Sequence, residues 1–136
     1  MRTLFTVLVA CTAPGAQAQL YESHSKQPGA TMDITVREIE RRPRASVVAI
    51  EMRQVGSSVG SSFFVLCSIR QLAVVRGGFG HVAKREEYPG RDQMLIGFLR
   101  SPSDPPIDAD PAFGAAGAKV DVIAREQFAP ICDGTK

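Results

Sequence analysis

The chain has 136 residues, 44% of them hydrophobic and 22% charged, and its formal net charge is +2. This length is enough for one domain and too short for two. The near-neutral charge argues against wholesale nucleic-acid binding, which needs a strongly basic face.

The first eighteen residues predict a cleavable secretory signal. Arg2 supplies a positive start, an apolar stretch runs up to Cys11, and Ala16-Gln17-Ala18 places small residues where a signal peptidase cleaves. We expect cleavage after Ala18 and a periplasmic or secreted product of 118 residues. One alternative is a lipid anchor on Cys11, because Leu8-Val9-Ala10-Cys11 resembles a lipobox. The other is that the stretch forms a strand or helix of the domain.

The beginning of the exported chain predicts a lead-in followed by two strands. Residues 19–30 are polar and contain Pro28-Gly29, which is typical of a flexible segment, so the domain is expected to cover residues 31–136. Apolar and polar residues alternate from Thr31 to Ile39 and again from Ala45 to Val55. This period of two indicates two half-buried strands.

A helix is predicted in the middle of the chain. Residues 56–62 are glycines, serines and one valine, and they form a loop whose serines can cap a helix. From Ser62 to Arg76 the apolar residues recur at helical spacing, and Gly77-Gly78 follow as a left-handed cap. No apolar run after residue 18 exceeds five residues, so we expect no transmembrane segment.

The last third of the chain predicts a hairpin, a loop and a short strand. Residues 79–87 and 93–100 flank a strong turn signal, and the second of these strands is apolar on both faces, as in the centre of a sheet. Residues 101–118, rich in Pro, Asp, Gly and Ala, predict a long surface loop before a strand at Lys119–Ala124. The order strand, strand, helix, strand, strand, strand predicts an α+β domain, with one helix packed on a mostly antiparallel sheet of about four or five strands.

One combination of features resembles a known pattern. The small-residue loop, a helix containing Arg70 and Ala73, and Gly78-Phe79 leading into a strand are similar to a pattern in uncharacterised bacterial envelope proteins and lipoproteins. The resemblance covers residues 45–100. These proteins have no known activity, so the resemblance implies a fold and an extracytoplasmic location, and no chemistry.

The cysteines predict one disulfide. With Cys11 removed or lipidated, Cys67 and Cys132 remain, and two cysteines in an oxidising compartment are expected to pair. Closing this loop would contribute about 4 kcal/mol in the chain-entropy model. The alternative is two separate buried thiols. No other Cys or His lies at ligand spacing, so we expect no metal and no cofactor.

The sharpest catalytic motif is Gly56-Ser57-Ser58-Val59-Gly60, which matches G-x-S-x-G between a predicted strand and helix. A serine nucleophile needs a histidine and a carboxylate, but only His81 follows Ser58 and no acid lies between them. We therefore interpret the loop as a helix cap, with a small serine hydrolase as an unfavoured alternative. Its free N–H groups could also hold an anion, which makes an anion-binding loop of Ser57, Ser58, Gly60 and Ser61.

The acidic residues of the 101–118 loop could resemble a calcium site. Asp104, Asp108 and Asp110 crowd together, but the glycine and glutamate positions of an EF-hand are missing, so we interpret them as a solvated loop. Residues 19–100 carry 12 basic and 8 acidic side chains, whereas residues 101–136 carry 3 and 6. The two parts either attract each other or are both solvated.

A basic cluster lies on the first predicted strand and just after it. It could contact phosphate-bearing lipid head groups or an acidic partner, or it could be a solvated strand end, which we favour. No aromatic residue is interleaved with it, so single-stranded nucleic acid has little to stack on. The cluster consists of Arg37, Arg41, Arg42 and Arg44, diluted by Glu38 and Glu40.

Together these features favour a non-catalytic binding or envelope-associated module whose partner is another envelope or extracellular protein. The first alternative is a secreted inhibitor of an extracellular hydrolase, working through the 101–118 loop. An enzyme is the least favoured hypothesis, because the sequence lacks a complete catalytic set.

Overall fold

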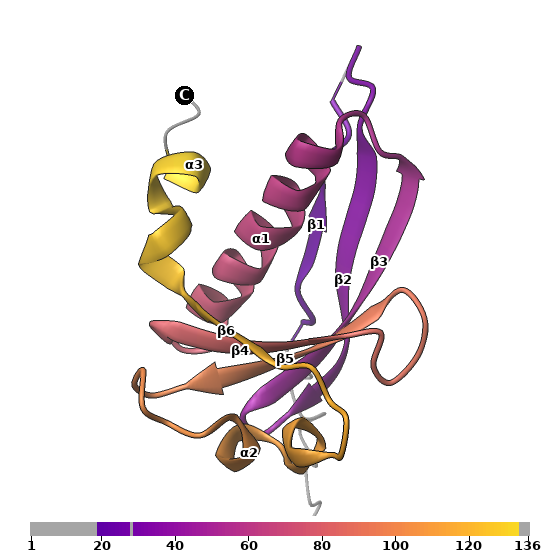
Figure 1. The fold of residues 1–136 in the computed structure, drawn as a ribbon. Helices are drawn as coiled ribbons and strands as arrows, with labels where there is room; N and C mark the ends of the chain where they lie inside the picture. Colours follow the sequence, from indigo (N-terminus) through magenta and orange to yellow (C-terminus); the bar gives the residue numbers. More distant parts are fainter. Residues whose placement is uncertain (1–18, 28, 134–136) are drawn as a thin grey trace, which may run out of the picture.

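The computed structural model describes residues 19–27 and 29–133 and has an α+β fold. Six strands form one antiparallel sheet in the order β1-β2-β3-β5-β4-β6, and the long helix α1 lies across one face (Figure 1). The leader and Cys11, with their cleavage and lipidation alternatives, lie outside the described residues. The elements are β1 (Glu22–His24), β2 (Asp33–Arg42), β3 (Ala45–Gln54), α1 (Ser58–Val75), β4 (His81–Glu86), β5 (Gln93–Leu99), α2 (Pro106–Ala109), η1 (Pro111–Gly114), β6 (Asp121–Ala124), η2 (Arg125–Phe128) and α3 (Ala129–Asp133).

The fold class and the predicted order of elements are confirmed, and the sheet gains one strand from the expected lead-in. This strand, β1, pairs antiparallel with β2. Just beyond it, Ser25 N donates to Ile34 O at 2.9 Å, and Ile34 N donates to the Ser25 hydroxyl at 2.8 Å. A polar strand of three residues has too few positions to show an alternating pattern, so the sequence reading missed it.

The larger hydrophobic core lies between the sheet and α1. Ile34 and Val36 of β2 face the helix, as the alternation predicted. The β5 strand lies between β3 and β4 and is buried on both faces, which confirms the prediction of a central strand. Its side chains alternate between two cores: Met94, Ile96 and Phe98 face α1, and Leu95 and Leu99 face the opposite side.

The segment 101–118 differs from the surface loop that its composition predicted, because it covers the other face of the sheet (Figure 1, bottom). Phe113 in η1 is only 6% exposed and fills the second core with Leu95 and Leu99. Gly97 makes room for it, since a Cβ at this position would lie 2.5 Å from Phe113 Cε2. The composition of the segment is typical of a loop, so it did not predict that Phe113 would be buried in the second core.

The helix α1 begins earlier than the predicted Ser62. Ser57 is its N-cap, and the Ser57 hydroxyl accepts a hydrogen bond from Gly60 N at 3.0 Å. The predicted glycine cap is confirmed: Gly77 and Gly78 have φ of 138° and 79°, and Gly78 N donates to Ala73 O at 3.0 Å. The helix α1 is long and apolar enough to cross a bilayer, but the core helices of globular domains meet the same criterion of length and composition.

The predicted disulfide is present. Cys67 in α1 is bonded to Cys132 in α3, with 5.5 Å between the two Cα atoms. Beside it, the Arg70 guanidinium makes a bidentate pair with the Asp133 carboxylate, at 2.7 and 2.9 Å. The end of the described chain is therefore tied to the helix by one covalent bond and one ion pair.

Candidate functional site

The serine-rich loop serves as a helix start. Gly60 N is already bonded to the Ser57 hydroxyl, and the hydroxyls of Ser61 and Ser62 donate to Ser58 O at 3.0 and 2.9 Å. His81 begins β4, beyond the other end of α1, and an 18-residue helix is about 27 Å long. The structure therefore does not bring Ser58 and His81 together. Anion binding by Ser57, Ser58, Gly60 and Ser61 stays a prediction.

The arginine cluster is paired with carboxylates of the same chain. Arg37 is exposed, as the favoured interpretation of a solvated strand end expected, whereas the other three arginines are partly buried. Arg37 contacts Glu51 at 2.9 Å, and Arg42 contacts Glu40 at 3.0 Å. Arg41 contacts the buried Glu38 at 2.7 Å. Because these guanidinium groups have partners, they are poorly placed to attract phosphate groups.

The acidic segment supplies the remaining partners. Arg42 contacts Asp110 at 3.2 Å, and Arg44 pairs with Asp104, which also accepts a hydrogen bond from Arg100 N. Asp110 is 8% exposed and caps η1 through Ala112 N at 2.9 Å. Hence the basic and acidic parts of the chain do attract each other, and Asp104 and Asp110 hold 101–118 on the sheet instead of forming a solvated loop.

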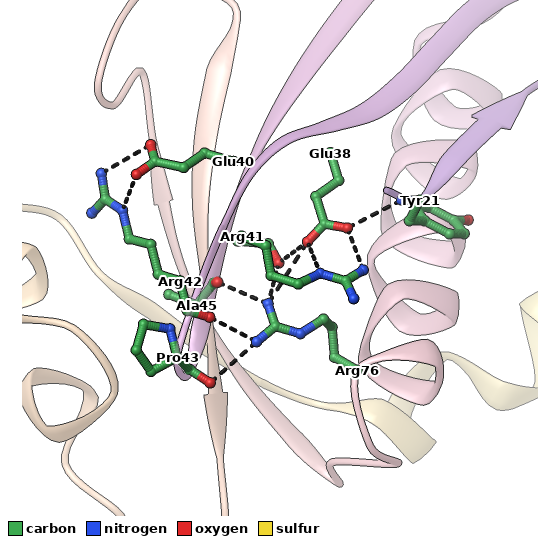
Figure 2. A network of polar contacts seen from close by, with 9 residues as sticks. Tyr21, Glu38, Glu40, Arg41, Arg42, Pro43, Ala45 and Arg76 are labelled. Atoms are coloured by element: carbon green, nitrogen blue, oxygen red, sulfur yellow. Dashed lines mark hydrogen bonds and ion pairs between the residues drawn. The ribbon is translucent and has the colours of Figure 1, made fainter. Parts of the chain in front are cut away.

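A buried carboxylate organises the same end of the molecule. Glu38 is 1% exposed and accepts hydrogen bonds from Tyr21 N, from the Ser46 hydroxyl and twice from Arg41 (Figure 2). Burial raises the pKa of Glu38, but the hydrogen bonds from Arg41, Ser46 and Tyr21 together outweigh burial and hold this pKa below its ordinary value. The sequence contained a signal for the burial of Glu38, because this residue follows Ile34 and Val36 at the alternate positions that face the core.

Arg76 closes the network from the end of α1. Its guanidinium lies 3.7 Å from the Glu38 carboxylate and donates to Arg42 O, Pro43 O, Ala45 O and the Ser46 hydroxyl (Figure 2). Burial is the main cause that lowers the pKa of Arg76. Both carboxylate oxygens of Glu38 and both terminal nitrogens of Arg76 are bonded within the chain, so this network fixes the helix to the β2–β3 turn. We therefore interpret the network as one that stabilises the fold, and we look for the binding site elsewhere.

A surface hollow lies at the opposite end of β3 from this network. It measures about 650 Å³ and is lined by residues 49–53 of β3, residues 86–87 and residues 91–94; we call it the β3 hollow. A second hollow of about 220 Å³ adjoins it on the side of α1, and the two share Ile50, Met52, Glu86 and Met94. Ligand sites commonly have this size and an apolar floor with a few polar groups.

The apolar floor and the rim of the β3 hollow differ in character. Ile50, Met52 and Met94 line both hollows, and Met52 is 51% exposed. On the rim, Glu51 is paired with Arg37 and Glu86 with Lys84, the latter at 3.1 Å. The other rim charges, which make no ion pair within the described part of the chain, are Arg53, Glu87, Arg91 and Asp92.

No group of three or more His, Cys, Asp or Glu side chains in residues 19–27 and 29–133 is arranged to hold a metal ion. Comparison of the chain with protein-family models, with curated proteins and with solved structures finds no match. The β3 hollow is therefore the candidate site, on geometry alone. Sequence reasoning missed it, because it depends on where β5 leaves β3.

Proposed function

We propose that this chain is an exported, disulfide-bonded binding module that holds an envelope or extracellular protein in the β3 hollow, without catalysing a reaction. The observation that carries the proposal is the hollow itself: an open cavity of about 650 Å³ with an apolar floor, in which Met52 is 51% exposed. A hollow with an apolar lining and a few polar groups is typical of binding sites.

Export rests on the leader and on the disulfide. The Cys67–Cys132 bond fits an oxidising compartment outside the cytoplasm. The finer proposal is a periplasmic or secreted protein cut after Ala18. The intact mass of the protein recovered from the extracytoplasmic fraction tests it, because a chain beginning at Gln19 is expected. A mass that includes a lipid on Cys11, or the uncut leader, would contradict cleavage at this bond.

The site is tested by photo-crosslinking at matched positions. A benzoylphenylalanine at Met52 reports on the β3 hollow, and one at Ile107 in α2 reports on the other face of the sheet. The two side chains are 51% and 52% exposed, so accessibility does not favour either. With extracytoplasmic extract, we expect a discrete adduct at Met52 and none at Ile107. Equal labelling at both positions would contradict a localised site.

The same experiment addresses the hydrolase-inhibitor alternative. That alternative assigns contact with the target to segment 101–118, where Ile107 is the large apolar side chain most exposed to solvent. An adduct at Ile107 but not at Met52 would favour it over the β3 hollow. Deleting the segment is a poor test, because Phe113 would leave the second core and the fold would be damaged.

A further inference from the structure

We propose that the partner enters the β3 hollow as an extended peptide that pairs, strand to strand, with the free edge of β3. This inference rests on the proposed function and specifies the mode and chemical class of its partner. It starts from the length mismatch between two neighbouring strands. β3 runs from Ala45 to Gln54, but β5 is paired only with residues 45–49.

The last contact along this edge is the hydrogen bond from Ile50 N to Asp92 O, at 2.8 Å. Asp92 then adopts φ of 59°, a left-handed conformation that turns the chain away from the line of β5. Figure 1 shows the β4–β5 turn swinging outward while β3 continues past it. Within residues 19–27 and 29–133, the distal half of β3 therefore has β2 on one side and no strand on the other.

The register identifies the backbone groups that face this open side. Ile34 of β2 lies opposite Met52, and the N–H and C=O of Ile34 are both bonded to Ser25, on the far side from β3. In an antiparallel ladder, residues of such a pair direct their backbone groups away from each other. The N–H and C=O of Met52 therefore point to the open edge, in line with Ile50 N. An unpaired strand edge is a template for another chain.

The hollow suits the side chains of such a strand. An added strand projects alternate side chains toward one face of the sheet. On the α1 side these would meet Ile50, Met52 and Met94, with Val65 and Leu66 of the helix behind them. Methionine adapts to apolar groups of different shape. Hence the peptide is expected to carry apolar residues at alternate positions, with main-chain hydrogen bonds supplying much of the affinity.

The charges favour a peptide over a phosphate-bearing ligand. Two arginines and four carboxylates line the β3 hollow. Two of the carboxylates, Glu51 and Glu86, are paired with Arg37 and Lys84, which leaves two of each sign. A phosphate group would meet at least as much like charge as opposite charge there. A neutral peptide backbone meets no such repulsion and satisfies the free groups of Met52.

The test uses a synthetic peptide of eight residues in which valine and threonine alternate, titrated into the protein at millimolar concentration and followed by amide NMR shifts. The matched control peptide has every second amide N-methylated, which removes its hydrogen-bond donors from one edge. A third sample contains anionic phospholipid vesicles without peptide. We expect shifts at Met52 and its neighbours with the first peptide, and at least tenfold weaker binding by the methylated one.

Two protein variants complete the test. Met52→Lys places a charge on the floor of the hollow, and we expect it to weaken binding of the peptide at least tenfold. Val122→Lys, on the edge strand β6, changes a side chain of similar exposure (49% against 51%) and should leave binding unchanged. Because both side chains lie on the surface, neither variant should unfold the domain.

Four results would overturn strand addition: no binding of the unmethylated peptide, equal binding of the methylated one, shifts induced by the vesicles alone, or concentration-dependent dimerisation abolished by Met52→Lys. The last would assign the edge to a second copy of the chain. If a crosslink at Met52 is found and the methylated peptide still binds equally, the proposed function survives and only the strand-pairing mode fails. If no crosslink forms at Met52, both the proposed function and the strand-pairing mode fail.

Discussion

The two ends of β3 contrast in how their polar groups are used. At the first end, around Glu38, Arg44 and Arg76, nearly every charge is bonded to another part of the chain. At the second end, around Met52, the strand edge is free and an apolar floor is open. The sequence drew attention to the first end, with its arginines and aspartates. The comparison teaches that a dense cluster of charge in this chain marks internal pairing, whereas the open site lies where apolar residues lack a cover.

The largest effect is expected at the first end, from Glu38→Gln. Losing the carboxylate leaves Arg41 and Arg76 without their buried counter-charge, and breaking a buried ion pair of this kind costs about 3–5 kcal/mol. Urea unfolding measures this as a lower midpoint. Glu51→Gln is the control, because its pair with Arg37 is about half exposed and should contribute less than about 1 kcal/mol. Equal losses would break the contrast between the two ends.

Removing the disulfide comes next. Cys67→Ser together with Cys132→Ser should lower the free energy of unfolding by about 4 kcal/mol, because the bond closes a separation of 65 residues. Unfolding of the wild type with and without reductant provides the same comparison in one protein. A change below about 1 kcal/mol would show that α3 contributes little to the stability of the domain.

A smaller loss is expected for Gly97→Ala, which tests how segment 101–118 is packed. The new Cβ would lie 2.5 Å from Phe113 Cε2, and overpacking of this kind costs about 1–3 kcal/mol. Gly80→Ala is the matched control, since no atom lies within 4 Å of its added Cβ. Equal midpoints for the two variants in thermal unfolding would mean that Phe113 is free to move away from β5.

Acid should weaken the network around the buried Glu38 carboxylate. The pKa of Glu38 lies below its ordinary value of 4.5, so its contribution to stability is fully present above that pH and is lost as the pH falls through the folded-state pKa. We expect the urea midpoint to be flat above about pH 5 and to decrease below about pH 4.5. Glu38→Gln should show a shallower decrease. An identical slope in both proteins would assign the acid sensitivity to other carboxylates, such as Asp104 or Asp133.

The smallest effect on stability is expected from Met52→Lys. The side chain is about half exposed, so its replacement should change the free energy of unfolding by less than about 0.5 kcal/mol. Circular dichroism during urea unfolding measures this. A loss above about 2 kcal/mol would show that Met52 belongs to the folded core and would argue against a binding surface there.

Local patterns predicted most of the fold, and long-range pairing decided the rest. The alternation around Ile34 and Val36, the helical spacing before Gly77 and the apolar run of β5 each act within a few residues, and each was confirmed. The β1 strand and the anchoring of Phe113 depend on partners far along the chain. The β3 hollow depends on the residue at which β5 turns away, which no local pattern records.

The serine motif shows that a local pattern can also suggest a site that the fold does not assemble. Gly56-Ser57-Ser58-Val59-Gly60 fits a catalytic pattern by its letters, whereas its geometry is that of a helix cap with Ser57 bonded to Gly60 N. A motif of five residues constrains too little, because the chemistry depends on groups from elsewhere in the fold.

Amide hydrogen exchange in the free protein tests the central claim most directly, by comparing two residues of β3 that direct their N–H groups to the same side. Ile50 N is bonded to Asp92 O, so its amide should be protected. We predict that the amide of Met52 exchanges at least a hundredfold faster than that of Ile50. Comparable protection of both amides in the monomeric protein would mean that the edge is already covered, which would contradict an open binding site on β3.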